Sequence, residues 1–135
     1  MGRLVLNNAY VVFGTNDLSD HISSISLQTS YDIVETTSFG NTAKTRVAGL
    51  QDNSVTFEFH QDFATSSVEQ VIYPLLGTAV TCTVKPVNAA VSATNPSYTF
   101  SVFISEWTPL NAGVGELLTA TTTLPISGAI TKATT

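Results

Sequence analysis

The segment from residue 54 to 60 alternates polar and apolar side chains, and this alternation constrains the fold more than any other feature of the chain. Val55, Phe57 and Phe59 take the odd positions, while residues 54, 56, 58 and 60 are polar. A period of two residues is typical of a half-buried β-strand. The pattern predicts a strand whose odd-numbered side chains face a hydrophobic core.

The same pattern recurs along the chain. It predicts further strands over residues 25–31, 80–84, 98–104 and 116–127, with one or two more in residues 3–13. Phe103 and Trp107 also make the second face of the 98–104 strand apolar, so that strand is either covered on both sides or meets another subunit. The polar tail, residues 127–135, is expected to fray.

A single segment, residues 66–76, has the pattern of a helix. Ser66 and Glu69 have the spacing of a capping box, in which each side chain bonds a backbone amide at the helix start. Four apolar side chains then share one face, and Gly77 offers a left-handed end: Val68, Val71, Ile72 and Leu75. We therefore expect one domain, residues 1–135, of the all-β, mainly antiparallel class. It would be a β-sandwich or partly closed barrel with one short flanking α-helix.

Charge and cysteine content restrict the possible functions. Ten acidic and five basic residues give a net charge of −5, which lacks the basic footprint of a general nucleic-acid binder. An acidic wall can still repel DNA and leave it untrapped. Cys82 is the only cysteine, which excludes an intrachain disulfide, and its strand phase predicts a buried thiol. No segment reaches the roughly 20 apolar residues of a membrane span, so we expect a soluble, unprocessed chain made in the cytoplasm.

Catalytic and metal-binding patterns find little support. His21 and His60 are the only histidines, and both are interpreted as solvent-facing strand residues. Asp17 and Asp20 lack the bend glycine and terminal acid of a calcium loop and fit an Asx turn instead. We therefore expect no catalytic residues, no cofactor and no metal site, and an enzyme is the interpretation with the least support.

The segment ETTSFGNTAKTRVAGLQ, residues 35–51, is far longer than a hairpin turn and is called the arm from here on. It carries two of the five basic residues among several threonines, and long loops in small domains are usually functional or disordered. Its TAKTRV core is expected to form a strand whose ladder a partner completes, making a long β-hairpin arm. A mobile surface hairpin is the simpler alternative.

Several motifs occur in an order that resembles a known family. ETTSFG is followed by AGLQD, by YPLLG at the end of the helical segment, and by SEWTPL before a threonine-rich strand. This order, over nearly the whole chain, resembles the major tail tube proteins of long-tailed (siphovirus-type) bacteriophages.

The resemblance implies a structural virion protein. In that family, hexameric rings stack into a hollow tube that conducts the genome into the host, and a long loop between two early strands reaches neighbouring subunits. The implied partners are copies of the chain itself, the tape measure, tail terminator and baseplate or tip proteins, and passing double-stranded DNA without specific binding. No membrane partner is implied, and the implied location is the virion tail, after synthesis in the bacterial host cytoplasm.

The site residues expected on this basis fall into two groups. The first lies in the arm and is expected to contact neighbouring subunits: Glu35, Phe39, Lys44, Arg46, Val47 and Leu50. Lys44 and Arg46 stand out in an acidic chain, and we expect them to meet carboxylates of an adjacent ring. The second group, Asp52 and Glu58, comprises candidates for the wall of the lumen.

Two alternatives remain open at this stage. One is a monomeric binding module, immunoglobulin-like or carbohydrate-binding, on a phage or cell surface. Its only candidate aromatic pair is Phe103 with Trp107. The other is a subunit of a related contractile or secretion tube, which is also assembled from rings.

Overall fold

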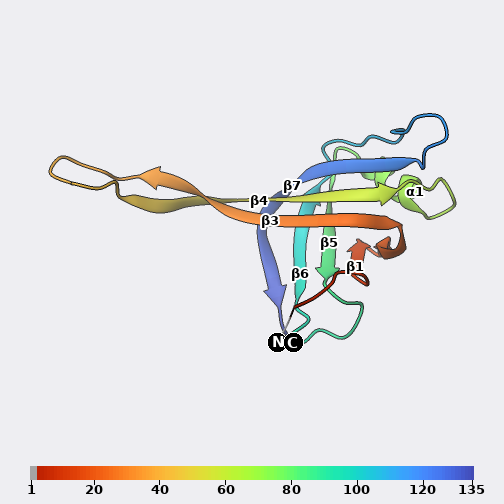
Figure 1. Ribbon diagram of the computed structural model, residues 1–135, viewed down its shortest axis with the longest axis horizontal. Helices are drawn as coiled ribbons and strands as arrows, with labels where there is room; N and C mark the ends of the chain where they lie inside the picture. Colours follow the sequence, from red (N-terminus) through yellow and green to blue (C-terminus); the bar gives the residue numbers. More distant parts are fainter. Residues whose placement is uncertain (1–2) are drawn as a thin grey trace.

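The computed structural model describes residues 3–135 and confirms an all-β, antiparallel fold with one short α-helix (Figure 1). The strands are β1 (Tyr10–Phe13), β2 (Asn16–Asp17), β3 (Ile22–Glu35), β4 (Arg46–His60), β5 (Ala79–Lys85), β6 (Ser97–Phe103) and β7 (Thr119–Ala133). The helical elements are the 3-10 turn η1 (Ser19–His21), the α-helix α1 (Val68–Ile72) and the 3-10 turn η2 (Tyr73–Leu75).

All seven strands belong to one bent sheet. Their order is β2-β1-β5-β6-β7-β4-β3, and every neighbouring pair is antiparallel. The first part of β7 pairs with β4 and its last part pairs with β6, so one long strand joins the two halves. The two end strands, β2 and β3, do not pair with each other, so the barrel stays open between them.

The bend in β7 lies just after its proline. Pairing with β4 ends at Pro125, and pairing with β6 begins at Ile126. Gly128 follows with φ of 90°, a conformation that glycine adopts without the steric cost of a side chain. The side-chain amide of Asn53 donates to the Gly128 carbonyl oxygen at 3.0 Å. This contact ties the bend to β4.

The core lies between the two halves of the sheet, as the predicted alternation requires. Val55, Phe57 and Phe59 are all fully buried. Phe13 of β1 packs against Phe57 of β4 with ring centroids 5.2 Å apart, so the two halves meet face to face as in a sandwich. Trp107 adds an edge-on contact to Phe59 at 5.5 Å.

Two sequence expectations about element ends are wrong. The tail does not fray, because β7 continues to Ala133 and pairs with β6 from Ser97 onward. The capping box also fails, since Ser66 has φ of 60° and no side-chain cap bond forms at the start of α1. The carboxylate of Glu69 instead accepts hydrogen bonds from Trp107 and Gln61, which hold it away from the helix start.

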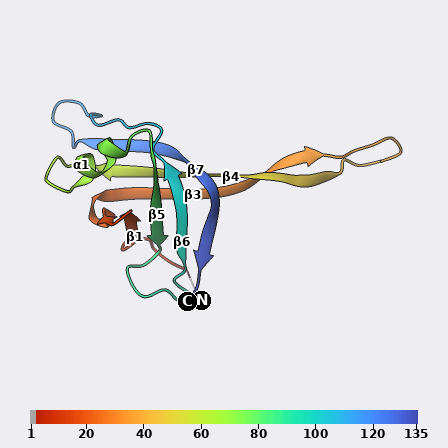
Figure 2. The same ribbon diagram turned by 180° about the vertical axis from the view of Figure 1, so that it is seen from behind.

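The arm projects far from the body as the outer end of the β3–β4 hairpin, which Figures 1 and 2 show from opposite sides. Its ladder is completed within the chain, because Val34 pairs with Val47 and Glu35 pairs with Arg46. The expectation that a partner supplies the second half of this ladder is therefore wrong. The reason is that β3 runs to Glu35 and β4 starts at Arg46, so both strands extend well beyond the segments that alternation marks.

Candidate functional site

The arm exposes apolar side chains on both sides of a two-stranded ribbon. Phe39 is as exposed as in an extended chain (108%), Leu50 is 81% exposed, and Val47 is 54% exposed. On the neighbouring strand β3, Tyr31, which pairs with Gln51, and Ile33, which pairs with Ala48, are also exposed. Isolated two-stranded ribbons are marginally stable in water, and contiguous exposed apolar groups mark contact surfaces. The geometry of the arm is that of an element built to be covered.

Hydrogen bonds order the tip of the arm. The Thr36 and Thr45 hydroxyls lie 2.8 Å apart, and the Thr36 amide donates to the Thr45 carbonyl at 2.8 Å. At the turn, the Asn41 side chain accepts from the Ser38 amide at 2.8 Å. The threonines and this Asx-type contact therefore stabilise a hairpin tip within one chain.

The basic side chains of the arm lie beyond the body of the protein. Arg46 stands opposite Glu35 in the β3–β4 register. Among residues 3–135 neither Lys44 nor Arg46 takes part in a salt bridge, and both are exposed. The arm thus carries two cations whose charges no described carboxylate of the same chain neutralises at close range.

A second surface, the outer face of β3, β4 and the first part of β7, is rich in hydroxyl groups and is called the hydroxyl face. In-register partners place eleven residues there: Ser24, Ser26, Gln28, Ser30, Asp52, Ser54, Thr56, Glu58, Thr121, Thr123 and Pro125. Thr56 and Thr123 lie 3.1 Å apart across the strands, and Ser23 donates to Glu58 at 2.8 Å. The face has two carboxylates and, at its end, the exposed His60 paired with Thr119; it has no Lys or Arg and no large apolar side chain.

The residues of this face are the polar positions of the alternating pattern in the sequence. Asp52 and Glu58 both lie on it, so the two lumen candidates share one surface. The sequence did not indicate the serines and threonines around them as a group, because uncharged hydroxyl residues form no charge pattern or motif. Their signal was the shared polar phase of three paired strands, at even-numbered positions of β3 and β4 and odd-numbered positions of β7.

His21 lies in the densest cluster of polar side chains, and it is not the solvent-facing strand residue that the sequence suggested. It belongs to η1, is half-buried, and places Nδ1 2.8 Å from Asp20 and Nε2 2.9 Å from Asp62. The Ser67 hydroxyl donates to Asp62 at 2.9 Å and lies 3.3 Å from Nε2. The tight turn before β3 removes His21 from the strand phase.

This cluster has the residue types of a nucleophilic triad but not its bonding. Because Nε2 donates to Asp62, it has no free lone pair with which to accept the Ser67 proton. Hydrogen bonds from the Ala64 amide, Ser67 and His21 lower the pKa of Asp62 and stabilise its charged form. The cluster therefore acts as a clamp between η1 and the loop that precedes α1.

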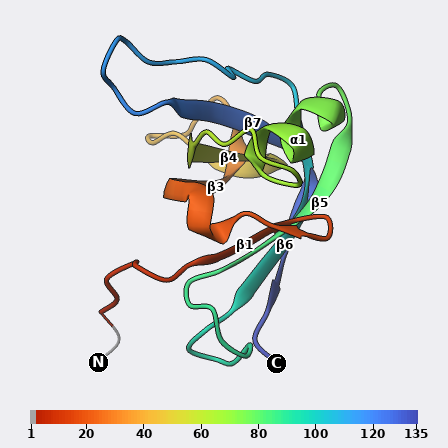
Figure 3. The same ribbon diagram turned by 90° about the vertical axis from the view of Figure 1, so that its right-hand side faces the viewer.

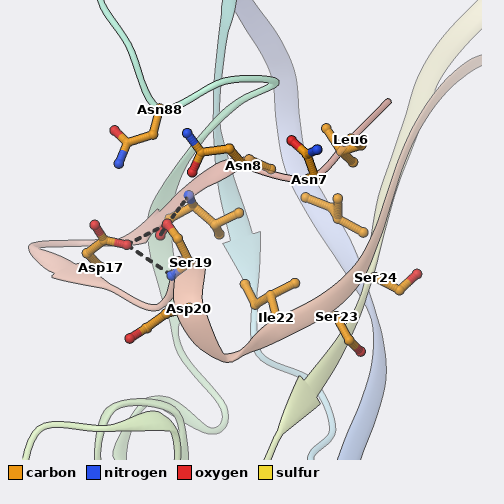
Figure 4. Close-up of a pocket in the computed structure, with 13 residues that line it drawn as sticks. Leu6, Asn7, Asn8, Asp17, Ser19, Asp20, Ile22, Ser23, Ser24 and Asn88 are labelled. Atoms are coloured by element: carbon orange, nitrogen blue, oxygen red, sulfur yellow. Dashed lines mark hydrogen bonds between the residues drawn. The ribbon is translucent and has the colours of Figure 1, made fainter. Parts of the chain in front are cut away.

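A cleft of about 650 Å³ marks the seam where the barrel stays open (Figure 4). Its walls are the N-terminal segment around Asn7 and Asn8 on one side and the start of β3 on the other. The Asp17 carboxylate accepts from the Ser19 amide at 2.9 Å, which confirms the predicted Asx turn. Since Asp17 is engaged in holding this turn, the cleft offers a strand edge rather than a reactive group.

The remaining candidates for binding chemistry are structural. Trp107 packs on Phe59 and its indole N–H donates to Glu69 at 2.9 Å, so it does not form an exposed aromatic platform with Phe103. Cys82 is fully buried as predicted, and burial raises the pKa of its thiol to about 12. Neither residue supports the binding-module alternative.

Two searches of the described part of the chain, residues 3–135, gave no further site. No group of three or more His, Cys, Asp or Glu side chains is arranged to hold a metal ion. No helix there has the length and apolar character needed to cross a membrane.

Comparison with known proteins finds no matching family model and no matching characterised protein by sequence. Solved structures do match. A chain from the PVC extracellular contractile injection system, sheath/tube terminator in extended state, superimposes with a TM-score of 0.72 at 14% identity, over 96% of this chain and 96% of that chain. The SPP1 tail tube gives a TM-score of 0.73 at 9% identity, over 95% of this chain and 77% of that chain.

A third structure, the virion of a native gene transfer agent particle, gives a TM-score of 0.69 at 9% identity, over 91% of this chain and 95% of that chain. At these identities the comparisons establish shared architecture. The chain has the fold found in the structures of phage tail tubes and of related injection-system tail assemblies.

Proposed function

We propose that this protein is the structural subunit of a tail tube, in which rings of the chain stack into a hollow conduit for genome ejection into the host. The observation that carries the proposal is the match to the SPP1 tail tube over 95% of the chain. The open sheet and the projecting arm, which an isolated monomer leaves without partners, support it. The same reasoning supports a non-enzymatic role.

The free edge of β3 favours ring formation. β3 is the end strand of the sheet, and its outer edge has no strand partner among the described residues. Natural proteins rarely leave a long edge uncovered, and closing strands into a ring removes it. Two similar structures, the anti-feeding prophage baseplate and the tail of the empty gene transfer agent particle, have sixfold symmetry, so we propose hexameric rings.

The hydroxyl face is the surface best suited to line the channel. A face without large apolar side chains gains little from being covered by protein, so its chemistry suits permanent contact with water. Its two charges, Asp52 and Glu58, repel phosphate, and it offers no Lys or Arg to which DNA can bind. Double-stranded DNA would pass along this wall without specific binding.

The arm provides the contact between subunits. Phe39, Val47 and Leu50 supply apolar area. Lys44 and Arg46, which lie in the arm together with Glu35, favour an acidic surface on the neighbouring subunit. An exposed ion pair contributes only ~0.2–1 kcal/mol, so burial of the apolar side chains must supply most of the binding free energy. The protein would be made in the host cytoplasm and reside in the virion tail, where tape measure, terminator and baseplate or tip proteins are its neighbours.

Negative-stain electron microscopy of the purified protein at high concentration tests this function. We expect rings or hollow filaments, and the double variant Lys44→Glu/Arg46→Glu should stay folded by circular dichroism yet fail to assemble at the concentration at which the wild type first forms tubes. Tubes of normal length from the double variant would contradict the role of the arm. Particles that remain monomeric, even with the phage's own tail initiator complex added, would contradict the tube function itself.

A terminal ring is the second candidate. It is favoured by the match to the structure of the contractile injection system terminator, which covers 96% of both chains. A terminator forms one ring and stops, whereas a tube subunit adds rings without limit. Single rings that never stack in the same micrographs would identify the terminal role.

A further inference from the structure

The end of the body opposite the arm also exposes apolar side chains, and we call it the cap surface. It consists of residues 61–76, which include α1, and the long loop 104–118. Figure 3 looks onto this end of the molecule. Within the loop, Leu110 is 73% exposed, Val114 is 108% exposed and Leu117 is 65% exposed. Nothing in one copy of the chain covers these side chains.

The cap surface is held firmly despite its loop structure. Gln61 joins its two parts, because the Gln61 amide donates to the Leu118 carbonyl at 3.0 Å and the side chain donates to the Pro109 carbonyl at 2.9 Å. These bonds fix the residues next to Leu110 and Leu117 in the chain. The Trp107–Glu69 hydrogen bond fixes the loop to α1. A surface held in this way binds without losing the entropy of an unstructured loop.

The charge of the cap surface is opposite to that of the arm tip. Residues 61–76 and 104–118 contain four acids, including Glu106 and Glu116, and no Lys or Arg. Both carboxylates belong to exposed residues. The arm offers Lys44 and Arg46 at the other end of the long axis (Figure 1). Each end therefore carries exposed apolar groups, and the charges differ: the arm has two bases and one acid, Glu35, whereas the cap surface has acids and no Lys or Arg.

We propose that the arm of one copy docks on the cap surface of the next copy, head to tail. This rests on the proposed assembly of the chain with itself and names the surface that receives the arm. Phe39 packs against the apolar side chains of loop 104–118, and Lys44 and Arg46 approach Glu106 and Glu116. Because the two surfaces differ, each copy donates one arm and receives one. Such a contact repeats from copy to copy.

Cross-linking between two variants tests the docking directly. Phe39→Cys protein is mixed with Leu110→Cys protein, assembled above the raised critical concentration that loss of the Phe39 ring causes, and treated with a short bis-maleimide. Native Cys82 is fully buried, so its thiol does not react with the maleimide. We expect a mixed dimer in high yield from this pair. The matched control, Phe39→Cys with Thr123→Cys on the hydroxyl face, should give none.

Charge exchange provides a second test. Lys44→Glu/Arg46→Glu should raise the critical concentration for assembly by about tenfold or more, and adding Glu106→Lys/Glu116→Lys in the same chain should recover most of the loss. Normal tubes whose Phe39→Cys arm never cross-links to Leu110→Cys would overturn the docking and leave the tube function standing. No self-association of the wild-type protein, with initiator present, would overturn both.

Discussion

Phe39 provides the sharpest quantitative test of the assembly proposal, because its side chain makes no protective contact in one copy. It is 108% exposed, so whatever apolar area it buries on assembly is a gain of assembly alone. Fully burying a Phe side chain contributes about 1.5–3 kcal/mol. At about 1.4 kcal/mol per tenfold change, Phe39→Ala should raise the critical concentration roughly 10- to 150-fold.

The assay is sedimentation of assembled protein over a range of total concentrations, with the soluble fraction giving the critical concentration. Thermal unfolding of the monomer is the control, and Phe39→Ala should leave it within about 0.5 kcal/mol of wild type, as is usual for surface positions. Phe39→Leu keeps most of the apolar area and should fall between the two. An unchanged critical concentration for Phe39→Ala would show that Phe39 stays in water in the tube, and the arm would then not anchor through it.

Three further predictions concern other parts of the molecule. Thr123→Lys on the hydroxyl face should make assembled tubes retain double-stranded DNA, with a salt slope steeper by about 0.9 for each phosphate contacted; retention equal to wild type would place this face outside the channel. Cys82, with its pKa raised to about 12, should resist a thiol reagent at pH 8 until the protein unfolds; rapid labelling of native protein would contradict its burial. Asp62 has a lowered folded pKa, so its stabilising effect is full above its unfolded value near 3.8 and is lost as pH falls through the lower folded value. Asp62→Asn should therefore flatten acid unfolding curves in that range, and identical curves would exclude the clamp as a contributor.

The strands and the core follow from alternation because that signal reports burial directly. Val55, Phe57 and Phe59 are buried because each second side chain of β4 meets the opposite half of the sheet. The full length of β3 and β4 does not follow from it. Beyond Tyr31 the ribbon has no core to face, so exposed apolar residues occur on both sides and the alternation disappears.

Tertiary partners account for the local expectations that are wrong. Ser66 and Glu69 have the spacing of a capping box, but Gln61 and Trp107 compete for the Glu69 carboxylate. Gln61 lies eight positions before Glu69, outside the helical segment, and Trp107 lies 38 positions after it. His21 likewise takes its role from Asp62, which lies 41 positions further along the chain. The spacing of residues in the sequence cannot show which other groups the fold brings close enough to compete for the same hydrogen bond.

The polar and apolar exposed surfaces of this chain are separated, and this separation makes a tube a more economical explanation than a binding module. A monomer that exposed Phe39 and Val114 permanently would risk non-specific association, with no gain from leaving the hydroxyl face free of large apolar side chains. In a tube, both features have a reason. The arm and the cap surface are covered by neighbouring copies, while the hydroxyl face is the one large surface that must remain wet. On the proposed function it should also bind nothing, because even a weak attraction, repeated from copy to copy, would arrest passing DNA. The absence of Lys and Arg from that face would then serve the proposed function as much as the presence of the arm.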